Sequence, residues 1–213
     1  MDFIDKAIED YAKLHTTPEP DSWKELTRET WMNKTYPRML SGHLQGALLS
    51  MLSQMIKPER ILEIGTFTGY SALALARGLN ENGLLYTIDI NEEHKSLAQK
   101  YFGKEIAGNK IKMIIGNALD IIPTLDKSWD LVFIDADKVN YSNYFDLVFD
   151  RVRPGGWIIA DNVLWSGKVL EKPDKVDKDT ESLIAFNDKI QVDNRIENMM
   201  LPFRDGLMLI RKK

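Results

Sequence analysis

Residues 62–79, LEIGTFTGYSALALARGL, run from an apolar stretch through two glycines into a segment whose apolar residues have helical spacing. A strand, a glycine turn and a helix in that order are typical of folds that bind a cofactor at the turn. The glycines are spaced Gly65-x-x-x-Gly69, so the three-glycine fingerprint that cradles a pyrophosphate is absent. The stretch predicts a cofactor site and leaves open which cofactor it holds.

The segments around this turn alternate between strand-like and helical patterns. Short apolar runs typical of buried strands occupy residues 60–65, 84–90, 111–115, 130–135 and 156–161. Helical spacing occupies residues 70–80, 92–107, 118–125 and 141–152. This alternation predicts an α/β fold with a mostly parallel sheet and helices on both faces. Two apolar runs around Asp205-Gly206 indicate a hairpin, so we expect the last strand to be antiparallel.

Three helical segments are expected before the first strand. Residues 2–15 have amphipathic spacing, and a loop from residue 39 leads into a helix that Pro58 ends. Residues 22–34 begin with Ser22 as a predicted cap and Glu25 as its capping-box partner. The charged stretch 171–181 is interpreted as a solvated loop.

The composition argues against several classes of function. The chain has no cysteine, which excludes disulfides, a thiolate nucleophile and cysteine-ligated zinc. Its 32 acidic and 28 basic residues give a net charge of −4, without the basic balance expected of a nucleic-acid-binding protein. The first residues include acids, and no apolar run approaches the ~18 residues of a membrane span. We therefore expect a soluble cytoplasmic protein with no nucleic-acid or membrane partner.

Polar residues follow the predicted strands where each strand ends. In open α/β sheets, ligands bind beyond the carboxyl ends of the strands. Acidic residues stand at four of the five ends, which favours a site over isolated turn residues. The residues at these ends are Glu63 and Gly65, Asp89, Gly116 and Asn117, Asp135 and Asp137, and Asp161 and Asn162.

The acid before the glycine turn indicates the kind of cofactor. Asp89 follows Gly69 by 20 residues, a spacing at which an acid reaches a ribose hydroxyl. Glu63 would repel a pyrophosphate but would suit an amine or another cation, and the missing glycine also speaks against NAD. S-adenosylmethionine has an amine, a sulfonium and a ribose, and no phosphate. An NAD-dependent oxidoreductase is the rival enzyme class.

Six collinear motifs carry a resemblance to a known family. They are EIGTFTGYSALALA, YTIDIN, GNALDIIPTL, DLVFIDADKVNY, RPGGWIIADNVLWSG and LPFRDGLMLIRK. In this order the chain resembles, from about Met39 to its end, the cation-dependent O-methyltransferases that act on caffeoyl-CoA and catechols. The resemblance implies a Rossmann-like class I methyltransferase fold with a seven-stranded sheet.

The resemblance also implies roles for individual residues. S-adenosylmethionine would be bound by Glu63, Gly65, Gly69, Tyr70, Ser71, Asp89, Asn117, Ala118 and Asp135. A divalent cation would be held by Asp135, Asp161 and Asn162. Lys138 takes the position of the general base, with Asp135 as the second catalytic residue. The acceptor would meet Met39, Ser41, Asp137 and Trp165.

The residue types support a cation without reference to the family. Asp135 and Asp161 end neighbouring predicted strands, so their carboxylates can converge, and Asn162 adds a neutral oxygen. An all-oxygen set suits Mg²⁺ first, and Mn²⁺ or Ca²⁺ could also bind there, whereas zinc prefers histidine or cysteine. The three histidines, His15, His43 and His94, are interpreted as surface or loop residues.

Lys138 has two interpretations. As a base it would remove a proton from the acceptor hydroxyl, which requires a pKa below the usual value of about 10.4. As a structural residue it would be a surface lysine paired with Asp137. The sequence favours the catalytic interpretation.

The expected function is metal-assisted methyl transfer from S-adenosylmethionine to one hydroxyl of a vicinal aromatic diol. Three further functions stay open: a methyltransferase acting on a different small molecule, a nucleic-acid methyltransferase and a non-catalytic cofactor-binding module. We expect one methyltransferase domain over residues 1–213. Within it, residues 57–213 would form the cofactor-binding core, and the helices of residues 1–56 would form a lid or homodimer contacts.

Overall fold

The predicted strands form most of a seven-stranded sheet whose order is β3-β2-β1-β4-β5-β7-β6. The computed structural model describes residues 4–172 and 175–213. The strands are β1 (Arg60–Ile64), β2 (Leu84–Asp89), β3 (Ile111–Ile115), β4 (Trp129–Ile134), β5 (Val152–Asp161), β6 (Ile196–Leu201) and β7 (Leu207–Lys212). β7 is antiparallel to both of its neighbours, and β1 to β5 pair in parallel, as predicted.

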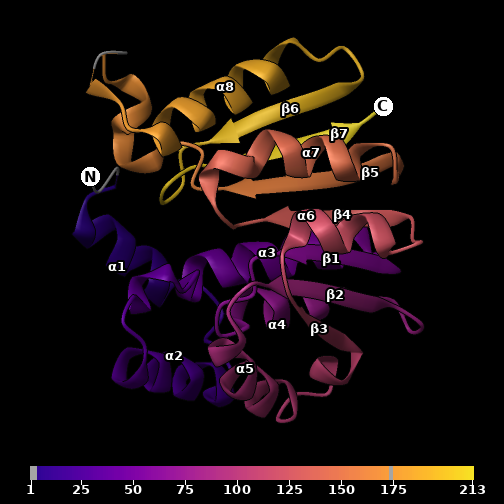
Figure 1. Ribbon diagram of the computed structural model, residues 1–213. Coiled ribbons are helices and arrows are strands. Elements are labelled where there is room, and N and C mark those ends of the chain that lie inside the picture. The colour runs from indigo at the N-terminus through magenta and orange to yellow at the C-terminus, as the bar shows by residue number, and fades with distance from the viewer. Residues whose placement is uncertain (1–3, 173–174) are drawn as a thin grey trace.

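Helices cover both faces of this sheet (Figure 1). They are α1 (Lys6–Leu14), α2 (Asp21–Asn33), α3 (Gly42–Ile56), α4 (Tyr70–Ala76), α5 (Lys95–Phe102), α6 (Ala118–Ile121), α7 (Tyr141–Phe149) and α8 (Lys178–Val192). α6, α7 and α8 bury their apolar residues against one face, and α2 to α5 bury theirs against the other. The predicted Rossmann-like class I fold is confirmed.

The central strand β1 shows why the sheet needs two helical layers. Leu62 and Ile64 pack into one apolar cluster, while Ile61 packs into the other, and all three are buried. β1 is paired on both edges and covered by helices on both faces, so apart from Arg60 and Glu63 its residues are apolar. Each fully buried aliphatic side chain contributes roughly 1.5–3 kcal/mol by leaving water.

The two N-terminal expectations differ in outcome. The helix predicted for residues 2–15 is α1, although residues 1–3 lie outside the described residues. The helix predicted for residues 22–34 begins at Asp21 with no side-chain cap, so the capping box of Ser22 and Glu25 is wrong. The Ser22 hydroxyl donates to Glu105 and Glu25 pairs with Lys104. Both side chains fasten α2 to the region of α5, a tertiary role that local spacing cannot show.

The charged stretch 171–181 is loop only in part. α8 begins at Lys178, where the Asp177 carboxylate accepts a hydrogen bond from the Thr180 N–H, and residues 173–174 lie outside the described residues. Most of the apolar residues of α8 come after the charged stretch, so the sequence pattern does not reveal where the helix begins. β5 begins at Val152 instead of residue 156, since its strand continues through a Pro-Gly-Gly sequence that resembles a turn.

The four helices predicted between the strands are all shorter than their patterns. α4 ends at residue 76, α5 covers residues 95–102, α6 covers residues 118–121 and α7 ends at residue 149. Separate 3₁₀ turns occupy Glu92–His94 (η2) and Ile122–Thr124 (η4). None of the helices in the described residues is long and apolar enough to cross a membrane.

The roles predicted for residues 1–56, as a lid or as dimer contacts, stay predictions.

Gly65 ends β1 in a position that only glycine fits. Its φ is +99°, and a Cβ at this residue would lie 1.9 Å from the Asp135 carbonyl oxygen. Its N–H donates to the Ile88 carbonyl, so the turn is held between β2 and β4. Gly42 also has a positive φ, +73°, but a Cβ there would meet nothing within 4 Å.

We therefore expect Gly65→Ala to lower the free energy of unfolding by about 2 kcal/mol or more, from strain and overpacking together. Gly42→Ala is the matched control, and strain alone predicts a loss of about 1 kcal/mol. Urea unfolding of both variants measures the difference. Equal losses would show that the close approach of Gly65 to β4 does not matter.

Candidate active site

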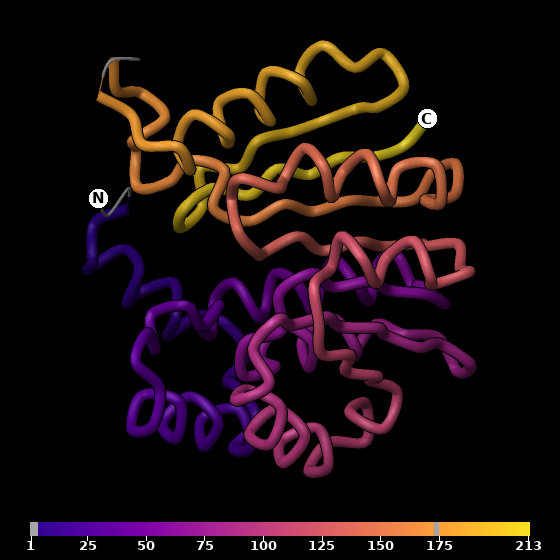
Figure 2. Tube along the Cα trace, in the orientation of Figure 1, coloured from indigo at the N-terminus to yellow at the C-terminus, as the bar shows by residue number. Residues whose placement is uncertain are grey.

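One cavity of about 1000 Å³ lies at the carboxyl ends of the parallel strands. Its walls come from distant parts of the chain, including residues 35–41, the glycine turn, the ends of β2, β4 and β5, and the loop before β7. In Figure 2 the N-terminal segment (indigo) and the loop after β5 (orange) reach the same end of the sheet. Binding cavities usually measure 300–1,000 Å³, so this one has room for a cofactor and an acceptor together.

Most residues predicted for the site line this cavity. They are Met39, Ser41, Gly65, Tyr70, Ser71, Asp89, Asn117, Ala118, Asp135, Asp137, Lys138, Asp161, Asn162 and Trp165. Glu63 and Gly69 do not line it. A Cβ at Gly69 would lie 2.5 Å from the Phe102 ring, so this glycine lets α4 pack closely on α5.

Asp89 is held by the backbone of the glycine turn. Its carboxylate accepts hydrogen bonds from the Phe67 N–H at 2.6 Å and the Asn91 N–H at 2.8 Å. Burial raises the pKa of Asp89, but hydrogen bonds from His94, Asn91 and Phe67 outweigh it and hold the pKa below its usual range. The carboxylate is therefore charged at neutral pH and ready to accept hydroxyl hydrogen bonds.

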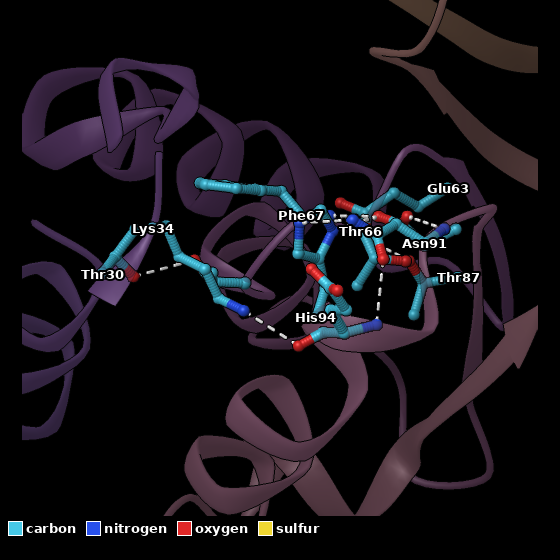
Figure 3. Close-up of polar contacts among 11 residues, drawn as sticks. Thr30, Lys34, Glu63, Thr66, Phe67, Thr87, Asn91 and His94 are labelled. Carbon is cyan, nitrogen blue, oxygen red and sulfur yellow. Dashed lines mark hydrogen bonds and ion pairs between the residues drawn. The ribbon is translucent and has the colours of Figure 1, made fainter. Parts of the chain in front are cut away.

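His94 is a site residue that sequence reasoning missed. Its Nδ1 lies 3.4 Å from Asp89 Oδ2, its ring packs edge-on against Phe67, and its side chain is 14% exposed (Figure 3). The interpretation of His94 as a surface or loop residue is wrong, because η2 turns it back toward the end of β2. The only signal was its place five residues after Asp89.

Glu63 lies buried beneath the glycine turn. Thr87 donates a hydrogen bond to Glu63 Oε2, whereas Oε1 has no partner among the described residues (Figure 3). Burial raises the pKa of this carboxyl to about 8, against the opposing effect of the Thr87 hydrogen bond. A buried acid with an unpaired oxygen is a group that a nearby cation would stabilise.

Asp135 directly follows β4, and Asp161 is the last residue of β5. The two lie side by side because Ile134 pairs with Ala160 in the sheet. Asp161 is 3% exposed, and burial together with the charge of Asp135 raises its pKa. Asn162 takes a left-handed conformation, with φ +61°. Among the described residues, no group of three or more His, Cys, Asp or Glu is placed to hold a metal. The predicted ligand set differs from such a group, because it has two carboxylates, Asp135 and Asp161, and the amide of Asn162.

Lys138 is buried between these groups and is not the surface lysine of the structural interpretation. Its Nζ donates to Tyr141 Oη at 2.7 Å, Asn162 Oδ1 at 2.9 Å and Asp135 Oδ1 at 3.3 Å. Asp137 pairs elsewhere, with the Tyr144 hydroxyl and the Asn140 amide. The lysine is thus in contact with two of the three predicted metal ligands.

Another part of the cavity lining is partly aromatic and partly basic. Met39 and Trp165 line the cavity as predicted, and Tyr36, Arg38 and Arg204 join them. Arg38 and Arg204 were not predicted, since neither stands at a strand end. Trp165 lies beside Lys138, whose Nζ is 5.6 Å from the centre of its ring.

Comparisons with known proteins agree with this geometry. Residues 13–213 match the O-methyltransferase family. The chain is 38% identical to caffeoyl-CoA O-methyltransferase 2 of Zea mays over 91% of this chain and 77% of that protein. It superposes on the Bacillus cereus O-methyltransferase in complex with SAH with a TM-score of 0.89, 28% identity and 97% of both chains covered. The O-methyltransferase TomG of Streptomyces achromogenes, in complex with SAM, gives a TM-score of 0.90, 28% identity, and coverage of 97% of this chain and 96% of TomG.

The burial of Lys138 predicts a stability effect. We expect Lys138→Met to lower the free energy of unfolding by about 3 kcal/mol at neutral pH, because the half-buried Asp135 carboxylate loses its ion pair and the buried Asp161 carboxylate loses a nearby positive charge. The loss should shrink as the pH falls and Asp161, whose pKa is raised by burial and by the charge of Asp135, takes up a proton. Lys24→Met removes an exposed pair with Asp21 and should cost at most about 1 kcal/mol. Equal losses in urea unfolding would contradict the buried role.

Proposed function

Because this chain belongs to the O-methyltransferase family, with relatives solved in complex with SAM and SAH, we propose that it methylates one hydroxyl of a vicinal aromatic diol. We propose further that a divalent cation, Mg²⁺ first, assists the reaction at Asp135, Asp161 and Asn162. The observation that carries this proposal is the pair of carboxylates at adjacent strand ends, one of them buried. Family membership speaks against an NAD-dependent oxidoreductase.

The donor set fits a hard cation. All three side chains offer oxygen, and the raised pKa of Asp161 reflects burial and repulsion by Asp135 that a divalent cation would relieve. When bound to both hydroxyls of a diol, such a cation lowers their pKa and fixes one oxygen toward the methyl group. The plant relatives are named for caffeoyl-CoA, whose caffeoyl ring carries two adjacent hydroxyls.

The protein's own residues would align the reactants. Asp89 would accept the ribose hydroxyls, and the charge of Glu63, buried beneath the glycine turn, would favour the cofactor's ammonium group above it. Met39 and Trp165 would hold the acceptor ring. Methyl transfer from a sulfonium requires the oxygen, carbon and sulfur in line, so this positioning would supply much of the rate. Lys138 lies between Asp135 and Asn162, and in its neutral amine form it would receive the hydroxyl proton.

Removing the cation or its ligand should abolish the reaction. We expect chelation with EDTA, or Asp161→Ala, to lower kcat for a catechol by roughly 100-fold or more, since several kcal/mol of transition-state stabilisation are lost. Calorimetry should show that the affinity for S-adenosylmethionine changes little. Full activity with the metal content measured as zero would overturn the metal proposal and leave methyl transfer intact.

The raised pKa of Glu63 predicts that the affinity for S-adenosylmethionine depends on pH. The free carboxyl, with a pKa of about 8, is mostly protonated at pH 7, whereas a bound ammonium group favours the carboxylate and lowers that pKa. Binding should therefore release a proton. The association constant should rise with pH, by at most about tenfold per unit, and level off above pH 8.

Calorimetry in two buffers of different ionisation enthalpy measures this proton release. Glu63→Gln is the matched control, because it keeps the shape of the side chain and cannot ionise. Equal proton release by the wild type and by this variant would show that Glu63 does not respond to the charge of the ammonium group.

A further inference from the structure

A chain of side chains joins two distant parts of the sequence to Asp161. Gln45, on α3, is 1% exposed, and its Nε2 donates to Asp161 Oδ2 at 2.5 Å. Its Oε1 accepts a hydrogen bond from Arg204 Nη1 at 2.7 Å. Arg204 stands in the loop between β6 and β7. The amide of Gln45 thus connects the last loop of the sheet to a predicted metal ligand.

Arg204 determines which way the Gln45 amide faces. A guanidinium group has only donors, so the amide must turn its oxygen toward Arg204 and its NH₂ toward Asp161. The other Asp161 oxygen, Oδ1, accepts the Asn162 N–H at 2.7 Å. Each carboxylate oxygen has one donor, so the plane of the carboxylate is fixed and each oxygen keeps a free lone pair.

The position of Arg204 is itself held firmly. Its φ is +50°, a left-handed conformation that costs energy outside glycine. The neighbouring Asp205 and Gly206 accept backbone hydrogen bonds from Leu164 and Val163 in the loop after β5. Arg204 Nη2 also donates to the Leu40 carbonyl at 3.2 Å, inside the segment of residues 35–41 that lines the cavity.

We propose that Gln45 is a positioning residue that orients Asp161 toward the divalent cation, and that Arg204 sets the direction of its amide. This inference rests on the metal-assisted function proposed above. Partners that orient a ligating carboxylate typically affect metal affinity by 10- to 100-fold. Because Arg204 also donates to the Leu40 carbonyl, the same side chain connects the predicted metal site to residues 35–41 of the cavity lining.

The test compares Gln45→Met with Gln54→Met. Both glutamines lie on α3, but Gln54 is exposed and its amide reaches only Ser50 in the same helix. We expect Gln45→Met to weaken Mn²⁺ binding, measured by electron paramagnetic resonance of the free ion, by roughly 10- to 100-fold. The affinity for S-adenosylmethionine should be unchanged, and Gln54→Met should match the wild type in both measurements.

Enzyme kinetics separate orientation from general damage. For Gln45→Met, the Mg²⁺ concentration giving half-maximal activity should rise, and kcat should return toward the wild-type value at saturating Mg²⁺. A damaged fold would not be rescued by the cation. If Gln45→Met does not fold, Arg204→Met, which frees the amide to turn, should raise the Mn²⁺ dissociation constant by roughly 3- to 10-fold, less than the loss of a full ligand-orienting contact.

The outcomes distinguish this inference from the function on which it rests. A wild type that binds no Mn²⁺ and keeps its activity after chelation would overturn the metal-assisted function. The second outcome is a wild type that binds Mn²⁺ and a Gln45→Met variant that differs little from it. If the Mn²⁺ dissociation constant and the half-maximal Mg²⁺ concentration of the variant lie within threefold of the wild-type values, only the role of Gln45 is overturned.

Discussion

The site depends on the register of three parallel strands. β1, β4 and β5 pair so that Ile64 stands beside Ile134 and Ile134 beside Ala160. The carboxyl ends of all three strands therefore lie at the same edge of the sheet, and Asp135 and Asp161 stand next to each other there. Two neighbouring carboxylates repel, and the structure places donors beside them: Lys138 at Asp135 and Gln45 at Asp161. The convergence of the two predicted metal-binding carboxylates follows from this pairing.

Strained backbone gathers around the same cavity. Of the six described non-glycine residues with positive φ, four line it: Phe67, Asn162, Trp165 and Arg204. Such conformations cost roughly 1–3 kcal/mol each and persist only where the surroundings impose them. Here the surroundings are hydrogen bonds between loops, such as those from Val163 and Leu164 to the loop before β7. The stability of the buried sheet offsets this cost, and the loops hold side chains where catalysis would need them.

The strand ends could be predicted from the sequence because each apolar run stops abruptly at a polar residue. Asp89, Asp135 and Asp161 each follow such a run, and parallel pairing carries them to one edge without further information. His94 and Gln45 could not be found in this way. One lies in a short turn and the other in a helix, and their roles depend on how those elements pack against the sheet.

The local sequence pattern thus determined the alternation of strands and helices, the glycine turn at Gly65 and the family to which the chain belongs. The spacing of apolar residues, the positions of glycines and the order of motifs can all be read along the chain without knowing how it folds. Tertiary structure alone decided that Ser22 fastens α2 to Glu105, that Lys138 is buried among predicted ligands, and that Gln45 reaches Asp161 across 116 positions of sequence. These contacts join residues far apart in the chain. Their distance and direction arise only when the helices pack on the sheet.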